Sequence, residues 1–306
     1  MADSVVSQIA TTEAERSSYR VRMLFSFFAV YVIWGTTFLA IRIAVEELPP
    51  LFAAAARFFI AGIVLYGFMR VKGEAAPAPK QWRNLGIVAL FLFVAEYAPL
   101  FWAEKFVPSG VVSVLAATIP ILTLLAEAAI LRETKHLKPG IIVATLIGFG
   151  GVAVLLLRGA DRTFSLVPCI AVLAGSVCWA VGSVFNRSLD LPKSRPVTAG
   201  ATMMLGGVGL FALSAGFGEL HPLPHISTRA IWALLYLIVF GSLVAFTAFV
   251  WLIGHMPASR VSSYAYVNPI IAVGIGYFWA GEPITPRILA GTALVLISVF
   301  LILRQK

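Results

Sequence analysis

Three ionisable side chains lie inside long apolar stretches of this chain. Glu96 is about twelve residues into its stretch, or about 18 Å along a helix, which places it close to the middle of a bilayer. Arg57 and Glu127 lie in two other stretches, each nearer to an end. Charged groups inside a bilayer are costly, and we therefore treat all three as functional candidates.

Two interpretations stay open for Glu96. Its carboxyl group could bind a proton or the amino group of a substrate, or it could pair internally with Arg57 or with a backbone donor. For Arg57 and Glu127 we favour local pairing or extension of the side chain toward the membrane surface, because both residues lie close to the end of a stretch.

Pro120 and Pro269 lie in the middle of two apolar stretches. A proline frees the carbonyl four residues earlier and kinks the helix, and a freed carbonyl is tolerated in a membrane only where it faces protein or a water-filled cavity. Asn268 precedes the second proline and can both donate and accept hydrogen bonds. We therefore predict that the two kinks mark a substrate pathway. The predicted pathway residues are Trp34, Thr37, Glu96, Tyr97, Thr118, Pro120, Trp179, Tyr264, Tyr266, Asn268 and Pro269.

Aromatic residues make up 12% of the chain, and most of them are expected to face lipid or the membrane interface. Trp34 and Trp179 differ because both fall in the middle of a stretch. Trp102 and Trp251 lie near stretch ends and are predicted to form a gate or an interface contact. An apolar cavity lined by aromatic side chains and a few polar groups suits a neutral or zwitterionic amphipathic solute. Aromatic or hydrophobic amino acids fit that description better than sugars, nucleotides or inorganic ions.

Signals for other chemistry are missing from the sequence. It has no G-x-S-x-G, H-E-x-x-H or G-x-x-x-x-G-K-[ST] pattern, which speaks against an intramembrane enzyme and against an ATPase on this chain. The ring of carboxylates or carbonyls expected of a channel filter is also missing. The two cysteines and four histidines show no metal-binding spacing, so we expect no metal and no cofactor. An enzyme or a scaffold within the membrane stays as the alternative from another class.

The elements that must position these residues follow from composition. The chain has 306 residues, of which 60% are hydrophobic and 12% charged, against roughly a quarter charged in soluble domains. A bilayer core about 30 Å thick requires about 20 apolar residues per helix. The sequence therefore predicts an all-α integral membrane protein with ten transmembrane helices, preceded by a cytoplasmic polar tail over 1–22. The predicted helices are 23–43, 51–69, 84–104, 109–131, 138–157, 164–187, 196–217, 229–252, 259–280 and 285–303.

The net charge of +9 is distributed unevenly over the predicted loops. Sixteen of the 23 Lys and Arg residues fall on the side of the two termini. Short cytoplasmic loops carry such an excess, so both termini are predicted to be cytoplasmic. The positive charge is then an orientation signal, and we expect no nucleic-acid partner.

An internal repeat relates the two halves of the chain. The chain is predicted to contain two related units of five helices each, over 23–157 and 164–303. Because five is an odd number, the second unit must enter the membrane from the opposite side. Inverted repeats of this kind are typical of secondary transporters. The matched pairs are Trp34 with Trp179, Arg42 with Arg187 and Gly62 with Gly207 at one displacement, and Trp102 with Trp251, Pro108 with Pro257, Pro120 with Pro269 and Glu133 with Glu282 at another.

The segment Trp34-Gly35-Thr36-Thr37-Phe38, together with Arg57, Pro120, Glu133 and their partners in the second half, carries a family resemblance. The chain resembles the drug/metabolite transporter superfamily, specifically its EamA-type ten-helix exporters, and is similar to aromatic amino-acid exporters. The resemblance covers nearly all of the chain. The second half departs from the pattern, with Ala180 where the first has Gly35 and Thr202 where the first has Arg57.

The resemblance implies an exporter of metabolites in the bacterial inner membrane, with a central pathway lined by the first, third and fourth helices and their mates in the second half. We expect a small-molecule substrate, contact with the lipid bilayer and alternating access to a cavity near the membrane midplane. A multidrug transporter, or a transporter of another metabolite such as a nucleoside or a sugar-like compound, remains an alternative with the same fold. Small-residue faces on the fifth and tenth helices are candidates for a homodimer contact.

Overall fold

The computed structural model describes residues 17–132, 139–156, 165–220, 226–255, 261 and 263–305. Within these ranges all regular elements are helices. Eight of the described helices are long and apolar enough to cross a membrane, and the predicted ninth and tenth spans correspond to the shorter apolar helices Val267–Ala280 and Pro286–Ile302. Glu133, Pro257 and the side chain of Tyr266 lie outside the described part.

The first helix already includes Ser17, the first described residue, and so it extends beyond the predicted start at residue 23. Polar residues such as Arg20 and Arg22 favour helix formation and prolong the helix beyond its apolar part, which an apolar window cannot detect. The remaining elements follow in chain order. They are η1 (Ala29–Ile33), α2 (Trp34–Val45), α3 (Pro50–Val71), α4 (Pro79–Ala89), η2 (Leu90–Val94), α5 (Ala95–Ala103), α6 (Ser109–Ala116), α7 (Ile119–Ile130), α8 (Pro139–Leu156), α9 (Leu166–Ser188), α10 (Arg195–Gly216), α11 (Thr228–Tyr236), η4 (Leu237–Val244), α12 (Ala245–His255), α14 (Tyr264–Ala280) and α15 (Pro286–Gln305).

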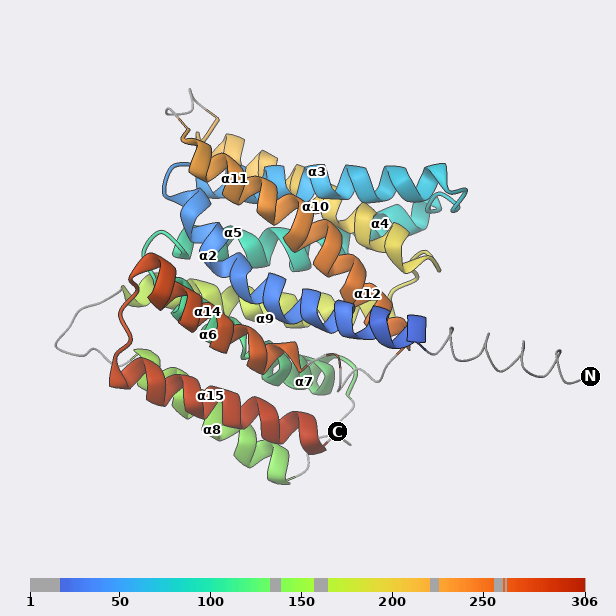
Figure 1. The fold of residues 1–306 in the computed structure, drawn as a ribbon. Coiled ribbons are helices and arrows are strands. Elements are labelled where there is room, and N and C mark those ends of the chain that lie inside the picture. Colours follow the sequence, from blue (N-terminus) through green and yellow to red (C-terminus); the bar gives the residue numbers. More distant parts are fainter. Residues whose placement is uncertain are drawn as a thin grey trace, which may run out of the picture.

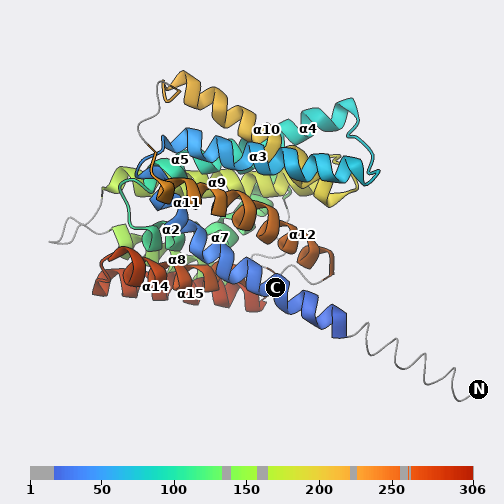
Figure 2. The ribbon, with the colours of Figure 1, turned by 45° about the horizontal axis from the view of Figure 1, so that its top comes forward.

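Two helix pairs form opposite edges of the bundle, and the other helices lie between them (Figures 1 and 2). α3 packs against α10 at one edge, and α8 packs against α15 at the other. Between these pairs, α2, α5, α6, α9 and α14 form the centre. The predicted small-residue faces of the fifth and tenth helices are used inside the chain, because a Cβ atom at Gly151 would lie 2.8 Å from Cβ of Leu294 on α15. These faces are therefore occupied within one chain.

A helix break occurs near one of the two predicted kinks, that at Pro120. The helix from Ser109 is interrupted at Ala117 and Thr118, and Pro120 stands in the first turn of α7 that follows. Thr118 stabilises the break by donating from Oγ1 to the carbonyl of Leu115 at 2.6 Å. Pro269 lies inside α14. Three π-helical segments, η1, η2 and η4, widen the helices that enter the centre, and such segments recur at functional sites.

We call the end of the bundle where α2 ends and α3 begins the distal end; the helix that leads into α2 starts at the other, proximal end (Figure 1). At the distal end, three carboxylates each accept hydrogen bonds from the start of another helix. Glu219 accepts from Phe52 N at 3.0 Å, and Glu47 from Ser227 N at 2.6 Å. Glu282 accepts from the first two amides of α6, at 2.8 and 3.2 Å. Each carboxylate therefore satisfies amides that have no partner within their own helix.

Candidate functional site

The central helices enclose a cavity of about 110 Å³. It is lined from both halves of the chain, including α2, α3, α5, α6, α9, η4 and α14. Nine of the eleven predicted pathway residues lie on its wall, so the structure brings together positions that are far apart in sequence. These nine are Trp34, Thr37, Glu96, Tyr97, Pro120, Trp179, Tyr264, Asn268 and Pro269.

The other two predicted pathway residues, Thr118 and Tyr266, are not among the described residues that line the cavity. Thr118 is fully buried at the break between α6 and α7, where its hydroxyl group bonds to backbone. It is not among the lining residues, because the hydrogen bond turns its side chain back toward α6. Tyr266 lies outside the residues whose side chains the structure describes.

Two aromatic groups line the cavity. In the first, Trp34 meets Tyr264 edge-on, with ring centroids 5.3 Å apart, and its Nε1 donates to the carbonyl of Gly241 in η4 at 2.9 Å. In the second, Tyr97 lies 4.4 Å from Phe58 and 6.1 Å from Trp179, measured between centroids. The indole and phenol rings thus present apolar faces to the cavity, and the Trp34 hydrogen bond fixes one of them in place.

Arg57 of α3 is buried in the cavity wall, with 3% of its surface exposed. The interpretation that it extends to the membrane surface is therefore wrong. Its Nε donates to Ser242 Oγ at 3.0 Å, and its guanidinium carbon lies 4.7 Å from the Phe58 centroid and 5.6 Å from that of Tyr97. Its Nη1 has no hydrogen-bond partner among the described residues. The aromatic faces and one hydroxyl hold the cation inside and leave part of it available.

Glu96 lies in the same wall and is also 3% exposed. Its Oε2 makes no hydrogen bond with any described residue, and a Cβ atom at Gly175 of α9 would come within 2.9 Å of that oxygen. No ion pair joins Glu96 to Arg57, although the structure describes both side chains. The cavity wall therefore contains a basic and an acidic side chain that are not joined by a direct ion pair.

Glu127 behaves as the pairing interpretation expected. Its carboxylate forms an ion pair with Arg187, at the end of α9, and lies away from the cavity.

Asn268 lines the cavity and also makes a structural hydrogen bond. When its amide nitrogen is turned toward the neighbouring carbonyls, this nitrogen donates to the Tyr31 carbonyl in η1 at 3.0 Å. This bond joins α14 to the helix that carries Trp34.

The two tryptophans predicted for a gate or interface lie at opposite ends of the bundle, outside the cavity wall. Trp102 is 37% exposed and contacts Phe106, with ring centroids 5.3 Å apart. Trp251 stacks on His255 at 4.3 Å and also lies near Tyr19.

Sequence reasoning missed several cavity residues. For Arg57 a signal was available, since it lies well inside a predicted span, whereas the other Lys and Arg residues within predicted spans lie at their ends. For the small and apolar residues no signal distinguished them from the many others of their kind. The missed residues include Phe58, Phe93, Ser113, Gly241, Ser242 and Phe246.

Helices that cross a membrane around an aromatic cavity with buried charges are the arrangement of a membrane transporter. The chain belongs to the EamA-like transporter family, whose sequence model matches it twice, over residues 21–157 and 166–304. The family lies within the drug/metabolite transporter superfamily. The chain is therefore a membrane transporter with several spanning helices, which implies a small-molecule substrate.

Individual relatives agree with this assignment. The uncharacterized inner membrane transporter YedA of Escherichia coli K12 is 35% identical over 282 residues, which cover 91% of this chain and 90% of the relative. The uncharacterized transporter YoaV of Bacillus subtilis is 24% identical and covers 92% of this chain and 96% of its own. A solved crystal structure at 20% identity superimposes with a TM-score of 0.63 over 92% of this chain and 96% of that chain, which supports the fold.

Proposed function

We propose that this protein is a secondary transporter that exports small amphipathic metabolites, in particular aromatic or hydrophobic amino acids. One observation carries the proposal: Arg57 and Glu96 are both buried in one aromatic cavity and make no ion pair with each other. A guanidinium group suits a carboxylate, and a carboxylate suits an ammonium group. A zwitterionic amino acid supplies both, while its apolar side chain contacts the rings of residues such as Trp34 and Tyr97.

The mechanism that we propose is alternating access, in which two inverted five-helix units over 23–157 and 164–303 rock about the cavity. The double match of the family model supports two related units. An odd number of helices in each unit would make them inverted, and inverted units can exchange conformations to expose the cavity on either side.

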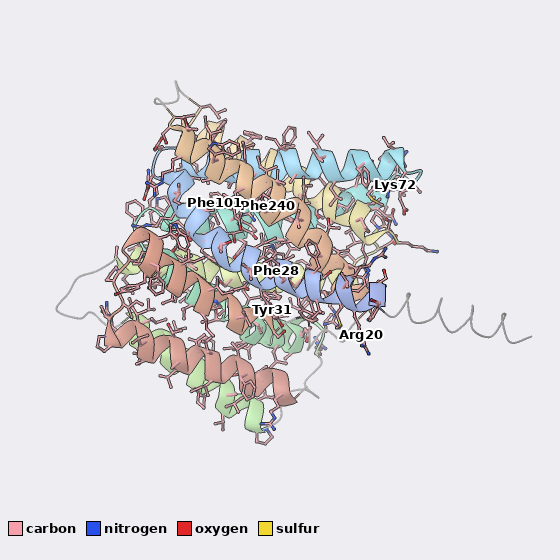
Figure 3. All side chains as sticks on the ribbon, in the orientation of Figure 1. Arg20, Phe28, Tyr31, Lys72, Phe101 and Phe240 are labelled. Carbon is pink, nitrogen blue, oxygen red and sulfur yellow. The ribbon has the colours of Figure 1, made fainter. Side chains whose placement is uncertain are left out.

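We further propose that the protein lies in a bacterial inner membrane, as the name of YedA states for that relative, with both termini in the cytoplasm. Basic residues near the proximal end support this orientation, and Arg20 and Lys72 both lie toward it (Figure 3). An excess of Lys and Arg marks the cytoplasmic side of a membrane protein.

Transport of labelled phenylalanine into liposomes that contain the purified protein tests this function. We expect saturable uptake that unlabelled aromatic and aliphatic amino acids inhibit, while lysine, glucose and a nucleoside inhibit weakly. Liposomes with the Glu127→Gln variant serve as the matched control, because Glu127 is a buried carboxylate outside the cavity. Inhibition by the nucleoside or by an amphipathic drug but not by amino acids would replace the proposed substrate class.

A further inference from the structure

A second group of charged residues closes the distal end of the bundle. Arg42 of α2 donates from Nη1 to the backbone carbonyls of Glu104 at 3.3 Å and Val107 at 2.8 Å, in the turn between α5 and α6. Its Nε lies 3.6 Å from Oε1 of Glu282, which follows α14 and caps α6. We call Arg42, Glu104 and Glu282 the distal latch, because they join α2, α5, α6 and α14.

Glu104 is the unsatisfied member of the distal latch. Its exposed fraction is 0%, and neither of its carboxyl oxygens has a hydrogen-bond partner among the described residues. An ionised carboxylate without donors is strongly disfavoured in a buried place. The closed arrangement therefore fits a protonated, neutral Glu104.

The latch lies about one helical turn beyond the cavity. Ile41, which lines the cavity, directly precedes Arg42, and the lining residue Leu100 comes one turn before Glu104. One turn corresponds to about 5.4 Å along a helix. The cavity can therefore open toward the distal end only if the four latched helices separate there.

We propose that Glu104 is a proton-binding site that controls the opening of the cavity at the distal end. While Glu104 carries a proton, Arg42 and Glu282 hold the helix ends together. When the proton passes to water on the distal side, two carboxylates face one guanidinium group in a buried space. The helix ends then separate, and water hydrates the new charge. This proposal concerns gating and holds for any substrate of the cavity.

The charged groups that act on Glu104 come from two neighbouring elements. Arg42 belongs to α2 and Glu282 to the connection between α14 and α15, while Lys105, the next residue in the chain, is exposed. Burial and, after it, the charge of Glu282 raise the pKa of the Glu104 carboxyl well above its usual value, and Arg42 opposes them. Opening lets water reach the carboxyl and returns its pKa toward the usual value.

The sign of the pH effect follows from these directions. The closed state binds the proton more tightly than the open state, so acidification between the two pKa values favours closure. A rise in pH over the same interval favours opening. Because one proton is involved, the ratio of open to closed molecules changes by at most about tenfold per pH unit.

Distances between spin labels test the proposal without any transport assay. Labels are placed at Lys105→Cys and Ile284→Cys, two exposed positions beside the latch, in a protein that also carries Cys169→Ala and Cys178→Ala. Pulsed electron paramagnetic resonance in lipid nanodiscs then gives the distance distribution from about pH 5 to about pH 9. We expect the fraction of the longer distance to increase with pH by several-fold. A distribution that does not change with pH would overturn the proposal.

Variants identify the responsible group. Glu104→Gln keeps the shape of a protonated glutamate and is expected to hold the short distance at every pH; Glu104→Leu, a second neutral variant, should do the same if the glutamine variant does not fold. Glu127→Gln at the proximal end is the matched control and should retain the full pH response. A neutral variant at position 104 that still responds to pH like the parent would assign the response to another group. The experiment measures a distance between two labels and requires no transported substrate. Its result therefore stays valid even if the protein does not export amino acids.

Discussion

Arg57 and Glu96 are held in the cavity wall by different means. The guanidinium group of Arg57 lies over two aromatic rings and donates to Ser242, so its charge is partly compensated. Glu96 lacks a donor for Oε2 among the described residues. A buried carboxyl in that situation is stabilised either by a proton or by an incoming cation. The two residues should therefore respond differently to substitution.

Arg57→Lys should weaken transport of substrates that carry a carboxylate. Lysine keeps the charge but lacks the planar fork that reaches Ser242 and stacks on aromatic rings. We expect the KM for phenylalanine to rise by about tenfold, the effect of losing one hydrogen bond to a charged group, while phenylethylamine, which has no carboxylate, is affected less. Competition in proteoliposomes measures the difference. Arg187→Lys, outside the cavity, is the control, and an equal rise for both compounds would contradict a role in carboxylate binding.

Glu96→Gln should separate the two interpretations of this residue. If Glu96 couples transport to protons, the variant loses its dependence on a pH gradient but retains downhill exchange. If Glu96 binds the substrate ammonium, exchange itself weakens. Uptake with and without a pH gradient gives the answer, and a variant that matches the parent in both measurements would remove Glu96 from the mechanism.

At the residue scale, the sequence predicted the type of site better than the state of each charge. Glu96, Tyr97 and Trp179 could be found because polar and aromatic residues in the middle of a span are unusual. The contacts of Arg57 could not be predicted, because other helices bring Ser242 and Tyr97 to it. Spacing within one helix carries no information on such contacts.

At the scale of elements, π-helical segments directly precede or contain cavity residues. η1 ends before Trp34, η2 ends just before Glu96, and η4 contains Gly241 and Ser242. A π segment places backbone carbonyls outside the regular hydrogen-bond ladder, and the Gly241 carbonyl is thereby available to Trp34. These segments are a means of orienting large aromatic side chains in a membrane helix.

Gly207→Ala should destabilise the edge formed by α3 and α10. A Cβ atom at this position would lie 2.5 Å from Phe59 N, a backbone atom that cannot turn aside. We expect a loss of about 1–3 kcal/mol and a lower Tm in detergent, measured by intrinsic fluorescence. Gly150→Ala is the matched control because nothing lies within 4 Å of its Cβ position. Equal Tm values for the two variants would mean that α3 and α10 can move apart freely.

Helix positions were predicted more reliably than helix interruptions. Continuous apolarity predicts a span because each backbone group must be satisfied inside the membrane. The break at Thr118 could be anticipated from Pro120, which cannot continue the preceding hydrogen-bond ladder. The π segments have no comparable signal, since Ala29–Ile33 and Leu90–Val94 read as ordinary apolar helix.

For the whole molecule, alternating access predicts reciprocal accessibility. Ser113→Cys, in the cavity wall of a protein without other cysteines, should react with an impermeant thiol reagent from one side at a time. A rise in distal pH should speed labelling from the distal side and slow it from the proximal side, in sealed vesicles of known orientation. Distal labelling rates are normalised to exposed Thr228→Cys at the start of α11, which corrects for the effect of distal pH on thiol reactivity. Labelling that rises from both sides together would indicate a channel.

The whole-molecule arrangement was less accessible to sequence reasoning than the spans. The matched Trp and Pro positions predict two related units, and this arrangement stays a prediction. Which helices pair at the edges could not be read from the repeat. That choice depends on glycines such as Gly62 and Gly151, whose partners lie in the other half of the chain.

The carboxylates that cap helix starts at the distal end all act between the two halves of the chain. Glu47 of the first half caps α11 of the second, whereas Glu219 and Glu282 of the second half cap α3 and α6 of the first. During synthesis, α3 and α6 therefore enter the membrane long before their caps exist. The final partners of these helix starts are therefore supplied only after the second half of the chain has been made.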